Sequence, residues 1–88
     1  MSETISAELS LYPLREADLG PAILEFVDEL RQEDLKIEAG PMSTLIVGPR
    51  DQVFEALKRA FTAASRRHQI VLRMVISNAC PIDASEGE

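Results

Sequence analysis

Three side chains that could contact a small molecule stand at alternate positions near the start of the chain: the Glu8 carboxylate, the Ser10 hydroxyl and the Tyr12 phenol. Side chains two residues apart on a β-strand point to the same face, so this spacing predicts one polar row, with Glu8 and Tyr12 about 13 Å apart. A planar cationic molecule could lie along it, because an aromatic ring attracts a cation and a carboxylate supplies the opposing charge. The alternative is a solvated or interface-forming face, with Glu8 paired to Arg73 across strands.

The strand that would carry this row is predicted from Ile5 to Leu14. Its other face is apolar at every second position, with Ile5, Ala7, Leu9 and Leu11. Such alternation is typical of a strand with one buried face. Pro13 should end the strand, because proline has no amide hydrogen to extend a central ladder.

Two helices are predicted. Asp18 and Pro21 mark the start of the first, over residues 21–33, since a carboxylate can cap it and proline suits its first turn. Its apolar stripe comprises Ala22, Ile23, Phe26, Val27 and Leu30. The second helix begins near Asp51, with an apolar stripe of Val53, Phe54, Leu57, Ala60, Phe61 and Ala64. We interpret the cations that follow as its C-terminal cap and not as an anion site: Arg66, Arg67 and His68.

Three more strands are predicted, at residues 35–38, 42–48 and 70–78. The first is short and charged, which is typical of a sheet edge, and the second is apolar, which favours the centre. In the second we place Leu45 and Val47 on the core face, which sends Thr44 and Ile46 to the face of Glu8. In the last, the core side would hold Ile70, Leu72, Met74 and Ile76, and the outer side Val71, Arg73 and Val75.

The order strand, helix, strand, strand, helix, strand predicts a ferredoxin-like α+β sandwich, a four-stranded antiparallel sheet with two helices on one face. Strands one and three would lie in the middle, with strand four beside strand one. Residues 1–81 would form this single domain and residues 82–88 an acidic disordered tail. The uncovered face would carry Ile46, Val71 and Val75. That apolar patch predicts a homo-oligomer, dimer or tetramer, or the floor of a ligand pocket.

Composition argues against several classes of partner. The net charge of −6 and the pI near 4.7 argue against nucleic acid. No apolar run is long enough to span a bilayer and the N-terminus lacks the features of a secretory signal, so the sequence predicts a cytoplasmic protein with no membrane partner. Cys80 is the only cysteine and His68 the only histidine, which leaves no internal disulfide and no cysteine or histidine metal cluster.

Catalytic and cofactor motifs are also missing from the sequence. There is no glycine-rich phosphate loop and no strand-to-helix nucleophile motif, so we expect no cofactor and no enzymatic activity. Residues 14–17 contain no glycine for the anion loop of an acylphosphatase, and only Tyr12 offers a sheet aromatic for RNA.

Three motifs together resemble the thiamine-binding-protein family, the YkoF-like small conserved proteins. They are S-L-Y-P-L at residues 10–14, G-P-M-S-T-L-I-V-G at 40–48 and S-N-A-C-P at 77–81. The resemblance implies a ferredoxin-like fold, oligomers built on the sheets, and binding of thiamine or its hydroxymethylpyrimidine part. The YkoF-type members have two such domains in tandem, whereas this chain has one.

Carried onto this sequence, the motifs give the polar pairs Ser10 and Tyr12, Ser43 and Thr44, and Ser77 and Asn78. Strand direction predicts that Tyr12 and Thr44 converge, while Asn78 lies at the other end of the sheet, as a structural cap or in a neighbouring subunit's site. The predicted ligand-binding residues are Glu8, Ser10, Tyr12, Ser43, Thr44 and Asn78.

The leading hypothesis is a non-enzymatic carrier or sensor of thiamine or a related pyrimidine, to which a negatively charged protein is suited. The alternatives are a ligand-free oligomerisation or regulatory module and a small cofactor-independent ferredoxin-like enzyme, an isomerase or monooxygenase.

Overall fold

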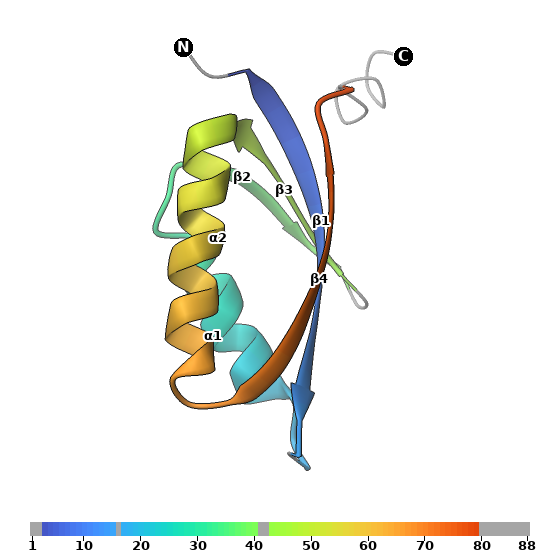
Figure 1. Ribbon diagram of the computed structural model, residues 1–88, viewed down its shortest axis with the longest axis vertical. Coiled ribbons are helices and arrows are strands. Elements are labelled where there is room, and N and C mark those ends of the chain that lie inside the picture. The colour runs from blue at the N-terminus through green and yellow to red at the C-terminus, as the bar shows by residue number, and fades with distance from the viewer. Residues whose placement is uncertain (1–2, 16, 41–42, 80–88) are drawn as a thin grey trace.

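The computed structural model describes residues 3–15, 17–40 and 43–79 as one layer of sheet covered on one face by two helices (Figure 1). The elements are β1 (Thr4–Leu14), α1 (Gly20–Leu30), β2 (Lys36–Ala39), β3 (Thr44–Pro49), α2 (Arg50–Ser65) and β4 (Gln69–Ser77). The strands pair antiparallel in the order β2-β3-β1-β4. The predicted ferredoxin-like α+β fold is confirmed. Cys80 and the predicted tail lie outside the described residues.

β1 is one of the two inner strands of the sheet and pairs with both β3 and β4. Its apolar row is buried as predicted, with Ile5, Ala7 and Leu9 between 0% and 4% exposed. Pro13 does not end the strand but stands opposite Ile70 of β4. β3 pairs with β1 only as far as Leu9, so Pro13 occupies a stretch paired on one side, where a sheet tolerates proline.

The predicted face assignment of β3 is wrong by one residue. Ile46 stands opposite Ala7 and is fully buried beneath the helices, and Thr44 stands opposite the buried Leu9. Residues directly opposite in an antiparallel pair share a face, so Leu45 and Val47 lie on the outer face instead. Because β3 has apolar residues on both faces, alternation alone could not decide between them.

Gly48 shows why β3 takes this register. It stands opposite Ile5 on the helix side of the sheet. A Cβ atom added to Gly48 would overlap the side chain of Leu35, which precedes β2. Leu35 is partly buried against the core cluster, so glycine leaves room for its Cδ2 methyl group, which would have to move if position 48 had a side chain.

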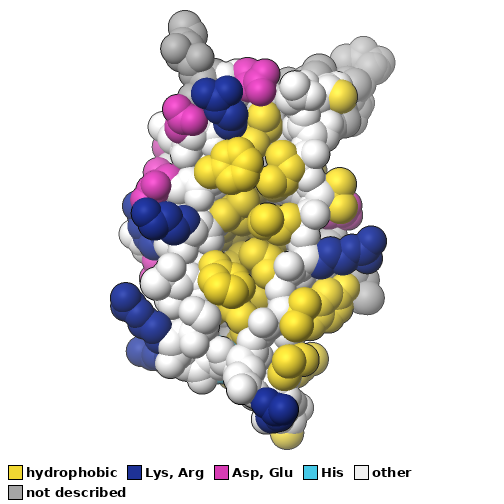
Figure 2. All heavy atoms as spheres, viewed as in Figure 1, with side chains coloured by type: hydrophobic (Ala, Val, Ile, Leu, Met, Phe, Trp, Pro, Cys, Tyr) yellow, Lys and Arg dark blue, Asp and Glu magenta, His cyan; other side chains and the backbone are white. Residues whose placement is uncertain are grey.

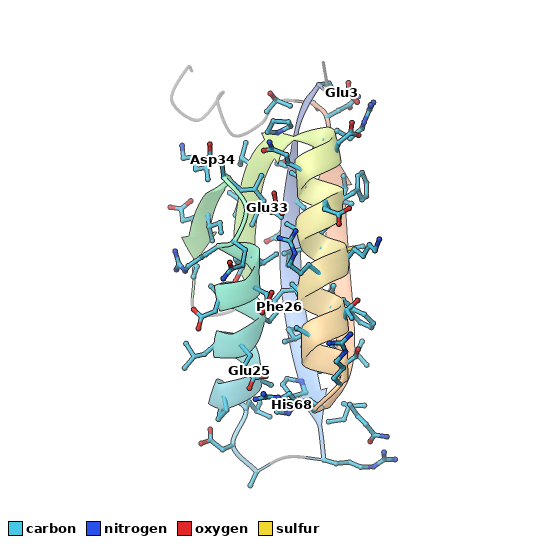
Figure 3. All side chains as sticks on the ribbon, turned by 90° about the vertical axis from the view of Figure 1, so that its left-hand side faces the viewer. Glu3, Glu25, Phe26, Glu33, Asp34 and His68 are labelled. Carbon is cyan, nitrogen blue, oxygen red and sulfur yellow. The ribbon has the colours of Figure 1, made fainter. Side chains whose placement is uncertain are left out.

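α1 packs its predicted stripe into the core, apart from Ile23, which is 37% exposed. Phe26 lies in the middle of the helical layer (Figure 3) and is 2% exposed. The helix ends at Leu30, three residues before the predicted end. The N-cap position is Leu19, which makes no side-chain capping bond, so Asp18 is not the N-cap that was predicted. Its carboxylate, one residue earlier, accepts a hydrogen bond from the amide of Gly20 at 3.1 Å.

α2 differs from its predicted stripe at both aromatic residues. Val53, Leu57, Ala60 and Ala64 are buried, but Phe54 is 47% exposed and Phe61 41% exposed. Ala56, Ala60 and Ala64, all fully buried, form a row at spacing four. These small side chains allow the helix close to the sheet, and the two phenylalanines lie beside the core and not in it.

The cations after α2 bind the other helix. Arg67 donates to Glu25 of α1 at 3.0 Å, and the His68 Nε2 atom lies 3.4 Å from the same carboxylate. Figure 3 shows Glu25 and His68 together at this end of the helical layer. The predicted capping by these side chains is therefore wrong for Arg67 and His68, which contact Glu25. The end of α2 is bonded by the backbone instead, since the amides at 67 and 68 donate to the Ala64 carbonyl.

Candidate functional site

The outer face of the sheet carries the predicted polar row of β1. Glu8 stands between Leu45 of β3 and Val75 of β4, and Ser10 stands opposite Arg73. Tyr12 stands opposite Val71 and is 49% exposed. The prediction that Glu8, Ser10 and Tyr12 share one face, away from the helices, is confirmed.

Two charged side chains line a shallow pocket on this face. The pocket has a volume of about 150 Å³ and is lined by Glu8, Ser10, Arg73 and Val75. The Ser43 hydroxyl donates to the Glu8 Oε2 atom at 3.4 Å, which orients the carboxylate weakly. Arg73 lies two residue pairs along the strands from Glu8, and the described residues show no ion pair between them. Both charges are therefore available to a ligand.

Thr44 does not join this pocket. It is 9% exposed, on the helix side of the sheet. There it borders a smaller cavity, about 60 Å³, between α1 and the sheet, lined by Leu9, Leu11, Ile23, Phe26, Val27, Gly40, Ser43 and Thr44. The predicted convergence of Tyr12 and Thr44 is wrong, because β1 extends beyond the start of β3 and no residue of β3 stands opposite Tyr12.

Asn78 lies at the far end of the sheet, as predicted from strand direction. It follows Ser77, which stands opposite Ser6 near the start of β1. Glu8 and Asn78 are therefore not brought into one pocket within a single chain.

Arg73 and Val75 line the pocket but were not among the ligand-binding residues predicted from the sequence. Alternation along β4 placed both on the outer face, and the predicted order put β4 beside β1, so the signal was present. What was missing was the register, which sets Arg73 opposite Ser10 and Val75 opposite Glu8. Among the described residues, no group of three or more histidine, cysteine or acidic side chains could hold a metal ion.

The pocket is small for an organic ligand. Sites that enclose such molecules usually have about 300 to 1,000 Å³, so a ligand here would be covered on one side only. A second protein surface over the sheet would supply the missing wall. None of the helices in the described part of the chain has the length and apolarity needed to cross a bilayer.

The split βαβ topology with one uncovered sheet face defines a ferredoxin-like α+β domain. The chain belongs to the thiamine-binding protein family, whose model matches residues 7–78. A search of curated proteins found no significant match.

Solved structures from several organisms share the fold. A hypothetical protein from Methanocaldococcus jannascii is 25% identical, with a TM-score of 0.78 over 85% of this chain and 79% of that one. A Thermotoga maritima protein provisionally assigned to thiamine biosynthesis or salvage has a TM-score of 0.81 at 15% identity, over 97% and 99% of the two chains. A Streptococcus pneumoniae protein has a TM-score of 0.83 at 20% identity, also over 97% and 99%.

Proposed function

We propose that this protein binds thiamine or a related hydroxymethylpyrimidine-type molecule without transforming it, as a carrier or sensor. The observation that carries the proposal is the pocket on the open sheet face, where Glu8, Ser10 and Arg73 converge in a chain of the thiamine-binding protein family.

The three polar groups suit different parts of such a ligand. A carboxylate accepts hydrogen bonds from an exocyclic amine, so Glu8 would hold the aminopyrimidine edge, with the Ser43 hydroxyl fixing its orientation. The exposed ring of Tyr12, two residues beyond Ser10 on the same face of β1, offers a surface for stacking. A guanidinium favours an anionic group, so Arg73 would select phosphorylated forms over free thiamine.

The outer face also supports the proposal of a homo-oligomer, dimer or tetramer. Ile46 is not part of it, but Leu45 and Val47 take its place beside Val71 and Val75. Val71 is 49% exposed and Val75 55% exposed. A second copy on this face would bury these side chains and cover the open side of the pocket.

The small pocket volume favours a second candidate, a ligand-free oligomerisation or regulatory module, in which Glu8 and Arg73 serve only subunit contacts. A thermal-shift screen separates the two. Thiamine, its phosphates and hydroxymethylpyrimidine would each be added at millimolar concentration. A ligand at ten times its dissociation constant adds about 1.4 kcal/mol, which raises the melting temperature of a domain this size by about 6 to 11 °C.

Glu8→Gln tests whether the pocket on β1 is responsible for any shift. The charge-matched control is Glu38→Gln. Glu38 and Glu8 lie on the same face of the sheet, on either side of Leu45, which pairs with both. We expect Glu8→Gln to weaken binding by about tenfold, for the loss of one charged hydrogen bond, and Glu38→Gln to have no effect. No shift with any of the compounds would refute the binding proposal, and equal affinity of the two variants would place the site elsewhere.

A further inference from the structure

Arg15, the residue that follows β1, has a backbone conformation that favours glycine. Its φ angle is 59°, and no other non-glycine residue in the described part of the chain has a positive φ. A Cβ atom makes this left-handed conformation unfavourable, whereas glycine adopts it freely. A residue held in such a conformation is often a functional one, and here the function must lie in the arginine side chain.

The Arg15 guanidinium reaches the outer face of the sheet at the end of the polar row. Its Nη1 atom donates a hydrogen bond to the Oε1 atom of Gln69, the first residue of β4. Gln69 lies two residues before Val71, which stands opposite Tyr12. Side chains two residues apart on a strand share a face, so Gln69 points to the same side as Val71. The hydrogen bond therefore holds the guanidinium just beyond Tyr12.

The charge of Arg15 is not neutralised by any acidic side chain that the structure describes. Gln69 is uncharged, and its bond leaves other guanidinium donors for a further partner. The residues paired at this end of β1 and β4 include no acid: Tyr12, Leu14, Gln69 and Val71. Figure 1 places the end of β1 and the start of β4 at the bottom of the molecule, where Figure 2 shows basic but no acidic side chains. This end of the outer face is thus positively charged in a chain whose net charge is −6.

Arg73 is a second cation on the same face. It lies four residues after Gln69 on β4, about 13 Å away between Cα atoms, with Val71 between them. Because Tyr12 stands opposite Val71, its phenol lies between the two guanidinium groups. Guanidinium groups bind phosphate oxygens through paired hydrogen bonds, and the phenol hydroxyl can donate one more. The ring of Tyr12 can stack on a planar part of the same ligand.

We propose that Arg15, Tyr12 and Arg73 bind the phosphate end of an aromatic organic phosphate and prefer a diphosphate to a monophosphate. The inference rests on the proposed function, in which Glu8 holds the amino group of the ligand. Glu8 and Leu14 are six residues apart on β1, about 20 Å along the strand. A ligand anchored at Glu8 therefore passes Arg73 before its far end approaches Arg15. A second phosphate both lengthens the ligand toward Arg15 and adds charge for its guanidinium.

The competing account is that Arg15 only joins the ends of β1 and β4 through Gln69. Calorimetric titration at low salt separates the two accounts, with thiamine, thiamine monophosphate, thiamine diphosphate and inorganic pyrophosphate as probes. We expect the wild type to bind the diphosphate about tenfold or more tighter than thiamine, for one added hydrogen-bonded charge. Arg15→Gln should remove most of this preference and leave the affinity for thiamine unchanged. Arg31→Gln, at an exposed position after α1, is the charge-matched control and should change neither affinity.

Arg15→Gly separates binding from stability. Glycine suits the positive φ angle, so the melting temperature should not fall, although the bond to Gln69 is lost. The affinity for the diphosphate should fall as it does in Arg15→Gln. Raising the salt concentration from about 0.05 to 0.5 M should also reduce the wild-type preference, because salt screens exposed charges.

The outcomes distinguish this inference from the proposed function. If thiamine binds but both Arg15 variants retain the wild-type affinity for the diphosphate, or Arg31→Gln loses as much as they do, the inference is overturned and the proposed function stands. If pyrophosphate binds through Arg15 and thiamine does not bind, the anion site is supported and the thiamine ligand is refuted. If none of the four probes binds, both proposals are overturned.

Discussion

The substitution Gly48→Ala tests the packing between β3 and the segment before β2. A Cβ atom at Gly48 would overlap the Cδ2 atom of Leu35 and lie 3.8 Å from Val53 of α2. Gly48 has no positive φ angle, so space and not backbone conformation is the reason for glycine here. Overpacking of one methyl group costs about 1 to 3 kcal/mol in a filled core, and we expect the lower end of that range here because the overlapping atom is the end of a flexible, partly buried side chain. Each kilocalorie lowers the melting temperature of a domain this size by about 4 to 8 °C.

Urea unfolding followed by circular dichroism measures this cost. We expect a lower midpoint with an unchanged slope, since the loss is in the folded state. Gly20→Ala is the matched control, because its nearest neighbour would be the Asp18 carboxylate at an ordinary contact distance of 3.4 Å. In a Leu35→Ala background the clash disappears, so Gly48→Ala should cost about 0.5 to 3 kcal/mol less there.

The sign of the effect decides between the two registers of β3. If Gly48 were on the outer face, alanine would fit a strand better than glycine and would stabilise the protein by about 0.5 to 1 kcal/mol. A Gly48→Ala variant as stable as the wild type, or more stable, would refute the packing described for Leu35.

Two other substitutions have defined outcomes. Phe26→Ala should lower the free energy of unfolding by about 3 to 5 kcal/mol, because the ring is 2% exposed at the centre of the core, and urea unfolding measures the loss. A loss below about 1 kcal/mol would contradict that burial. Tyr12→Ala should weaken binding of a pyrimidine ligand by about 0.5 to 2 kcal/mol in calorimetric titration through lost stacking, with little change in stability at a position 49% exposed. Unchanged affinity would remove Tyr12 from the site.

Periodicity predicted those parts of the fold in which one face is apolar and the other polar. The alternation in β1 and β4 gave the correct face of every paired residue, and the stripe of α1 gave its buried side. β3 is apolar on both faces, so its register depends on Leu35 and Gly48, which lie 13 positions apart in the sequence and meet only in the folded chain. The misplacement of Thr44 follows from that single error.

The phenylalanines of α2 show a different limit. Phe54 and Phe61 have the spacing of a core stripe, and hydrophobic spacing does not distinguish a side chain that is buried from one that remains half exposed beside the core. Alanine at positions 56, 60 and 64 determined which side of the helix meets the sheet. Half of the pocket could be predicted from the sequence, because Glu8 and Ser10 come from one strand. Arg73 and Val75 could be added only once the register between β1 and β4 was known.

The two edge strands of the sheet differ in their protection against intermolecular strand pairing. β2 has four residues, two of which are Lys36 and Glu38, whereas β4 has nine residues with Arg73 as its single charged side chain. Shortness and charge keep an edge strand from pairing with a strand of another molecule. Replacing both Lys36 and Glu38 with valine would therefore remove this protection at β2, and we expect such a variant to aggregate at concentrations at which the wild type remains dispersed.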